Sequence, residues 1–203
     1  MYIFWDNSNI HYSGLAFMEI KEPTQDKNLF RTNFKNLFKL VKGNRKVDAA
    51  YLSGSIPPPS NALWDYLRSM NINLQLLNKT ADGTEQESVD MSLQTMMLRT
   101  AIDYIHTPST IAVLTGDGAG KQLGEGFLTD LQRIHSMGWK IEVYSWSSSC
   151  NRHLKEFAEK NGVFVALDDY YFSITYLKDD RYNPTGKPIR ASSKLILKDK
   201  QQI

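Results

Sequence analysis

The sequence is poor in cysteine and in long apolar runs. Cys150 is its only cysteine among 203 residues, which excludes an internal disulfide and a zinc site built from several thiolates. No apolar run approaches the roughly 20 residues that cross a bilayer, and the N-terminus lacks the basic start and the cleavage site of a signal peptide. We therefore expect a cytoplasmic protein with no membrane partner.

The charge shows no strong excess of either sign. Lysine and arginine number 24 against 22 acidic residues, which gives a net charge of +2. This balance neither requires nor excludes a nucleic-acid partner, because a basic groove can exist on a nearly neutral protein. The four histidines are not spaced as a helical pair, so a histidine-rich zinc site is not expected. The length suits one globular domain of medium size.

Short apolar runs alternate with longer segments of helical periodicity through most of the chain. The apolar runs are typical of strands buried on both faces of a parallel sheet. The predicted strands are residues 2–5, 47–52, 74–77, 111–114, 141–144 and 163–166. The predicted helices are residues 29–41, 60–70, 87–105, 127–134 and 151–160. This alternation predicts an α/β fold, a three-layer α/β/α sandwich with a mostly parallel central sheet.

Three acidic residues are expected at one edge of this sheet. Asp6 directly follows the first predicted strand, Asp117 follows the fourth, and Asp90 lies in the first turn of the third predicted helix. Ligands of open α/β sheets bind at the carboxyl ends of the strands, so we expect the three carboxylates to converge in one crevice. Each also has a plainer explanation, as a turn residue, a helix cap or a first-turn helix charge.

A convergent set of carboxylates predicts a bound cation. Acidic side chains held close together repel one another, and a divalent ion removes that repulsion. Oxygen ligands suit Mg²⁺ or Mn²⁺, the ions that usually act on phosphates. The sequence therefore predicts a magnesium or manganese site at the carboxyl edge of the sheet.

Three short motifs carry a resemblance to a known family. They are DNSN at residues 6–9 after an apolar strand, SVD at residues 88–90 opening a helix, and LTGDG at residues 114–118. In this order and spacing they resemble the signatures of the NYN domain, a family of the PIN-like nuclease superfamily. The resemblance covers residues 1–171 and implies a PIN-like α/β/α fold. It leaves residues 172–203 as a basic C-terminal extension, of which we expect part at most to be ordered.

The resemblance also implies an activity and the residues that perform it. It implies metal-dependent endonucleolytic cleavage of RNA, with Asp6, Asp90 and Asp117 as catalytic residues and metal ligands. Asn9 matches the polar residue that supports the first carboxylate. A metal held there would activate water for attack on a phosphodiester, and single-stranded RNA or RNA loops are the expected substrate because such a backbone can bend into a crevice.

The sequence departs from the family pattern at several acidic positions. Ala119 stands where many relatives carry a second aspartate, and Met96-Met97 stands where a further acid often follows. Glu125, after a small insertion, is a candidate metal ligand or else a first-turn helix charge; Glu87 is a weaker substitute. These departures leave a second interpretation open, in which a catalytically reduced PIN-like module binds RNA or a protein without cutting.

Further residues are candidates for holding the substrate. Lys79, Lys121 and Arg152 are expected to contact flanking phosphates, whereas Tyr12 and Trp146 are candidates for stacking on unpaired bases. Most of the other aromatic residues are expected in the core. The stretch around Lys121 lacks the glycine and hydroxyl spacing of a Walker A loop, but a nucleotide-binding α/β protein remains a third interpretation.

The last stretch of the chain is basic. Residues 178–203 hold seven basic and three acidic residues, hence a net charge of +4. This stretch is either a solvated terminus or an arm that contacts phosphates. The sequence leaves open whether the chain forms a homodimer.

Overall fold

Six parallel strands form the centre of the computed structural model, which describes residues 1–55, 61–77, 86–118, 126–181 and 186–197. The strands are β1 (Tyr2–Asp6), β3 (Ala49–Ser55), β4 (Ile72–Leu77), β5 (Thr110–Leu114), β6 (Lys140–Ser145) and β7 (Val163–Ala166). Their order across the sheet is β4-β3-β1-β5-β6-β7. All six predicted strands are present, and the mostly parallel α/β fold is confirmed.

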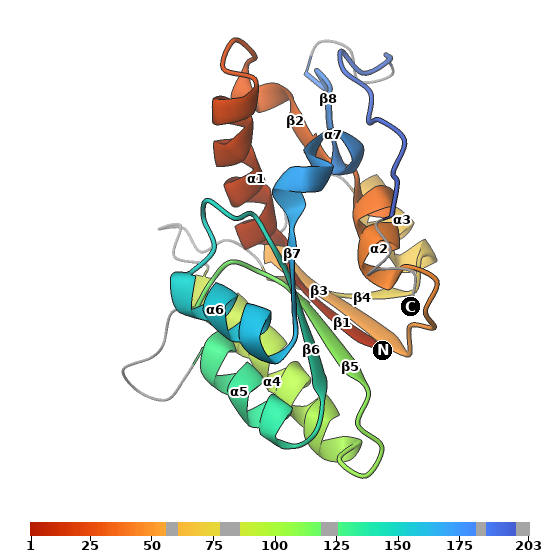
Figure 1. The fold of residues 1–203 in the computed structure, drawn as a ribbon. Helices are drawn as coiled ribbons and strands as arrows, with labels where there is room; N and C mark the ends of the chain where they lie inside the picture. The colour runs from red at the N-terminus through yellow and green to blue at the C-terminus, as the bar shows by residue number, and fades with distance from the viewer. Residues whose placement is uncertain (56–60, 78–85, 119–125, 182–185, 198–203) are drawn as a thin grey trace.

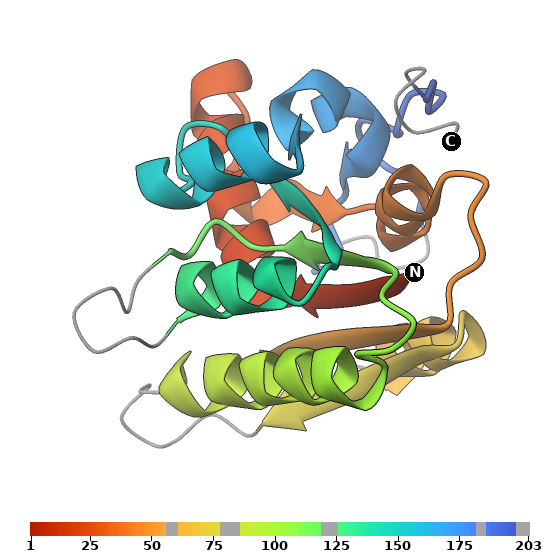
Figure 2. The ribbon, with the colours of Figure 1, turned by 60° about the horizontal axis from the view of Figure 1, so that its bottom comes forward.

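Helices cover both faces of this sheet (Figures 1 and 2). One layer contains α1 (Asn7–Lys21), α2 (Phe34–Lys42), α3 (Asn61–Ser69) and α7 (Tyr171–Ile174). The other contains α4 (Gln86–Asp103), α5 (Phe127–Ser136) and α6 (Arg152–Asn161). Side chains alternate along β1, so that Ile3 and Trp5 enter the first core and Phe4 enters the second. Among the described helices, none combines the length and the apolar character of a membrane span.

The segment before α2 differs from the prediction. Residues 29–41 were predicted as one helix, but the chain first forms a 3-10 turn (η1, Lys27–Leu29) and the strand β2 (Phe30–Thr32). The helix begins only at Phe34, because the side chain of Asn33 accepts the N–H of Asn36 and caps it there. Phe30 therefore lies on a strand that pairs antiparallel with β8 (Thr175–Leu177).

The C-terminal segment folds onto the first helical layer. The predicted boundary between residues 171 and 172 falls inside α7, which follows the 3-10 turn η2 (Leu167–Tyr170). Arg190 forms an ion pair of 3.1 Å with Glu22, and its guanidinium lies over the ring of Tyr171. Leu195 and Leu197 pack against the first core. In the described part of this segment, Arg190 is therefore held by the protein itself.

A close contact between α1 and the core yields a stability prediction. A β-carbon on Gly14 would lie 2.8 Å from Cζ of Phe30 and 2.9 Å from Cζ2 of Trp146. Alanine improves helix propensity by about 1 kcal/mol, but overpacking a core costs about 1–3 kcal/mol. We expect Gly14→Ala to lower the free energy of unfolding by about 1 kcal/mol, measured by urea denaturation.

The matched control is Ala16→Gly at an exposed position of the same helix. It isolates helix propensity and should lower the stability by about 1 kcal/mol. A stabilising effect of Gly14→Ala would contradict the close packing of α1 against the two rings.

Candidate metal and nucleic-acid site

The candidate site lies where the strand order reverses. From β1 the chain continues to β3 on one side of the sheet, and it later returns to β5 on the other side of β1. Such a switch point opens a crevice at the carboxyl ends of the two strands. Asp6 ends β1, and Thr115, Gly116 and Asp117 follow the end of β5. The fold thus brings together two of the predicted acidic positions.

Asp6 is a buried carboxylate with two functions in the fold. It is the N-cap of α1, where its Oδ1 accepts the backbone N–H of Asn9 at 3.0 Å. Its Oδ2 accepts the hydroxyl of Thr115 at 3.1 Å. The pKa of Asp6 is raised to about 6, mainly by burial and in smaller part by the nearby charge of Asp117, against the lowering effect of these hydrogen bonds.

Asn9 ties the first helix to the loop after β5. Its side-chain oxygen accepts the backbone N–H of Gly116 at 2.7 Å. Asn9 therefore supports Asp6 through its backbone N–H, and it holds the loop that carries Asp117 through its side chain. The predicted supporting role of Asn9 remains a prediction, and this geometry is compatible with it.

Two glycines allow the loop around Asp117 to pack closely. A β-carbon on Gly116 would lie 2.9 Å from Oγ of Ser145, and one on Gly118 would lie 2.5 Å from Cγ of Asn151. The N–H of Asn151 also donates to the carbonyl of Gly116 at 2.8 Å. Side chains at these two positions would push the loop away from the end of β6 and from the cap of α6, and Asp117 would move with it.

The third acid is placed by its backbone only. Asp90 belongs to the first turns of α4, whose N-terminal end lies beside the carboxyl edge of the sheet (Figure 2). Its side chain lies outside the described residues, as do Glu125, Lys79 and Lys121. Among the side chains that are described, no three acidic, histidine or cysteine groups form a metal cluster.

The described donors nevertheless suit a hydrated divalent ion. Asn7 Oδ1 and Ser53 Oγ are buried, and neither has a hydrogen-bond partner in the described structure. Ser53 is the register partner of Asp6 on the neighbouring strand. Buried oxygens without partners are uncommon in native proteins and usually indicate a water or an ion. Like the carboxylates of Asp6 and Asp117, these two side chains offer oxygen, the donor that Mg²⁺ and Mn²⁺ prefer.

The predicted substrate-binding residues fall into two groups. Arg152 is exposed at the start of α6, where it lies 3.5 Å from Glu156, and Tyr12 is exposed on α1. Trp146 is only 1% exposed, its ring stacks on Phe17, and its indole N–H donates to the carbonyl of Ile10. The prediction that Trp146 stacks on RNA bases is wrong, because its side chain is buried against α1.

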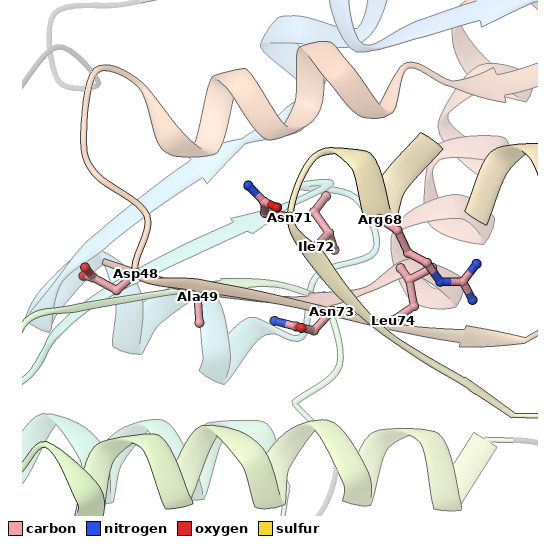
Figure 3. A pocket seen from close by; sticks show the side chains of 7 residues that line it. All are labelled: Asp48, Ala49, Arg68, Asn71, Ile72, Asn73 and Leu74. Carbon is pink, nitrogen blue, oxygen red and sulfur yellow. The ribbon is translucent and has the colours of Figure 1, made fainter. Parts of the chain in front are cut away.

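A separate hollow lies at the opposite edge of the sheet (Figure 3). Its volume is about 490 Å³, and it is lined by the starts of β3 and β4 together with Asp48, Arg68 and Asn71. Because these are the amino ends of the strands, the hollow does not belong to the crevice around Asp6.

Two residues that support the candidate site were not predicted from the sequence. Thr115 donates its hydroxyl to Asp6 and also accepts the N–H of Asp117 at 3.1 Å. Asn151 caps α6 and holds the loop of Gly116. The sequence signal for the first residue is a hydroxyl side chain directly after an apolar strand, and the structure shows that this threonine is buried.

The chain is similar to a known family and to a solved structure. A family model described as the NYN domain matches residues 1–168. A crystal structure of a protein of unknown function from Vibrio parahaemolyticus is similar, with a TM-score of 0.58 and 18% sequence identity over 83% of this chain and 92% of that chain. No curated protein matches. At this identity the crystal structure shows the fold alone.

The raised pKa of Asp6 gives a pH-dependence prediction for the metal-free protein. Its pKa is about 6 in the folded state and 3.8 when unperturbed. The folded state therefore binds this proton more tightly, and the resulting stabilisation is complete below about pH 4 and disappears as the pH rises through about 6. The shift corresponds to about 3 kcal/mol, measured by urea denaturation with EDTA present.

Asp6→Asn is the reference variant, because asparagine still caps the helix but does not titrate. As the pH rises from 4 to 7, the unfolding free energy of the wild type should fall relative to that of the variant. A difference that stays constant over this range would contradict the burial of an ionisable Asp6.

Proposed function

The chain belongs to the NYN domain family, and on this premise we propose that it is a metal-dependent endoribonuclease. NYN domains have a PIN-like nuclease fold and are generally nucleases, and PIN-like nucleases typically use divalent metals. The observation that carries the proposal is the pair Asp6 and Asp117 at the switch point of the sheet, where burial raises the pKa of Asp6 and the nearby charge of Asp117 contributes to this rise. Two carboxylates in this arrangement favour a cation between them.

The metal would be Mg²⁺ or Mn²⁺, held by Asp6 and Asp117, with Asp90 and Glu125 as further candidate ligands. Such an ion lowers the pKa of a bound water and stabilises negative charge on a phosphodiester. Asn9 and Thr115 would act as positioning residues, because they hydrogen-bond the strand ends that carry the two acids. Ligand carboxylates are usually oriented by such partners.

The substrate would be RNA in a single-stranded or looped form. Arg152 and Tyr12 are exposed and are available for a phosphate and for a base respectively. Lys79 and Lys121, which lie outside the described residues, complete the set of proposed phosphate contacts. Cys150 is a free thiol. A chain without a disulfide suits the reducing cytoplasm, where we expect the enzyme to act.

A second candidate function is an RNA-binding or protein-interaction module of the same fold. Met97 supports this candidate. Its side chain is fully buried in the core against the sheet, near the position where relatives often carry a further acid. Ala119 likewise removes a candidate ligand. A reduced ligand set that still holds an ion would bind RNA without cutting it.

The nuclease proposal is tested by cleavage of a labelled single-stranded RNA in the presence of Mn²⁺. We expect cleavage by the wild-type protein, no cleavage with EDTA, and a loss of at least about 100-fold in Asp117→Asn, because a direct ligand matters more than the partners that orient it. Asn9→Ala should lose about 10- to 100-fold.

Asp65→Asn, at an exposed acid of α3 that pairs with Arg68, is the matched control and should cleave normally. Cleavage that survives both EDTA and Asp117→Asn would contradict the metal-dependent mechanism. RNA retention without cleavage in any divalent metal would instead support the binding module.

A further inference from the structure

Ser53 carries a buried hydroxyl group that has no partner among the described residues. It lies near the carboxyl end of β3, its exposed fraction is 0%, and its Oγ makes no hydrogen bond in the described structure. Burying a polar group without a partner costs free energy, and such groups are uncommon in native proteins. The hydroxyl of Ser53 therefore indicates a water or a ligand beside it.

Ser53 and Asp6 point to the same face of the sheet. Leu52 precedes Ser53, Trp5 precedes Asp6, and both of these apolar side chains enter the first core. Because successive side chains of a strand alternate between the two faces, Ser53 and Asp6 face the layer that contains α4, α5 and α6. The two residues are also register partners on neighbouring strands, whose backbones lie about 4.8 Å apart.

A second hydroxyl lies on the other side of Asp6 and behaves differently. Thr115 directly follows β5, the other neighbour of β1 in the sheet. Its hydroxyl donates to Asp6 at 3.1 Å, whereas Ser53 makes no hydrogen bond to its register partner in the described structure. Asp6 is thus flanked by one hydroxyl that binds it directly and by one that does not.

The buried amide of Asn7 lies on the other face of the sheet. A β-carbon on Gly54 would lie 3.4 Å from Cβ of Asn7. Gly54 follows Ser53, so this β-carbon would point away from the face of Asp6 and toward the layer of α1. Ser53 therefore shares a face with Asp6, and Asn7 does not.

We propose that Ser53 is a positioning residue of the cation site, where its hydroxyl oxygen accepts a hydrogen bond from a water bound to the ion beside Asp6. A water can bridge two polar side chains that lie side by side without a direct bond. Mg²⁺ in particular keeps several of its waters when it binds protein carboxylates. The inference rests on the proposed cation at Asp6, and it is independent of RNA cleavage.

The role of Ser53 is tested by the affinity of the full chain for Mn²⁺ without RNA, measured by titration calorimetry. Outer partners of metal ligands typically contribute 10- to 100-fold, so we expect Ser53→Ala to weaken Mn²⁺ binding about tenfold. Ser53→Cys keeps a similar shape, but sulfur is a weak acceptor, so it should weaken binding as well. Thermal unfolding verifies that each variant is folded.

The stability of the metal-free protein separates this role from a structural one. In urea denaturation with EDTA, Ser53→Ala should be at least as stable as the wild type, because the hydroxyl that it removes has no described partner in the protein. A hydroxyl that supports the fold would give the opposite result.

Ser145→Ala is the matched control. Ser145 is likewise buried, and its Oγ has no hydrogen-bond partner in the described structure. It lies at the end of β6, two strands away from β1. We therefore expect this variant to bind Mn²⁺ as the wild type does.

The inference is overturned by wild-type Mn²⁺ affinity in both folded variants of Ser53, by a lower stability of metal-free Ser53→Ala, or by an equal loss of affinity in Ser145→Ala. A wild type that binds no Mn²⁺ overturns the cation site and the inference together. Mn²⁺ binding that is weakened in Ser53→Ala, in a protein that never cleaves RNA, supports the inference and contradicts the nuclease alone.

Discussion

The burial of a carboxylate at the end of β1 is the constraint on which the candidate site depends. Removing an ionised group from water is unfavourable unless hydrogen bonds and opposite charge compensate. At Asp6 the compensation is the N–H of Asn9 and the hydroxyl of Thr115. It is incomplete, because burial still raises the pKa of Asp6 to about 6. A divalent cation bound beside Asp6 would supply the missing positive charge.

The same carboxylate connects the site to the rest of the fold. As the cap of α1, Asp6 determines where the first strand ends and the first helix begins. The first turn of that helix then places Asn9 against Gly116, and its middle packs Gly14 against the ring of Trp146. A shift of α1 would therefore disturb the core and the candidate site together, because one helix serves both.

The sequence predicts the sheet and two positions of the site for clear physical reasons. Residues 111–114 of β5, for example, are buried on both faces of the sheet. Such strands appear in the sequence as apolar runs, and they can be recognised without knowing which strands lie beside them. Asp6 and Asp117 follow such runs directly, and parallel pairing brings strand ends together without further information. The joint position of the two acids was therefore predictable before the structure.

Other elements depend on contacts between distant parts of the chain. The helix α1 buries only Ile10, Gly14 and Met18, a pattern too sparse to be recognised among its polar residues. The three-residue strands β2 and β8 form only because they pair with one another across the chain. Trp146 follows a strand end, as a site residue would, and only the packing of α1 and α7 shows that its ring points inward.

The chemistry of residue 6 separates a structural role from a functional one. If capping α1 were the whole role of this side chain, asparagine would serve equally well and would carry no charge into the interior. An aspartate whose pKa is raised to about 6 instead destabilises the metal-free protein at neutral pH. Such a local disadvantage is typical of residues that bind or react. The raised pKa of Asp6 favours a cation at this edge for both the nuclease and the reduced module. The two proposed functions would then differ in what happens to the RNA, because both would use the ion.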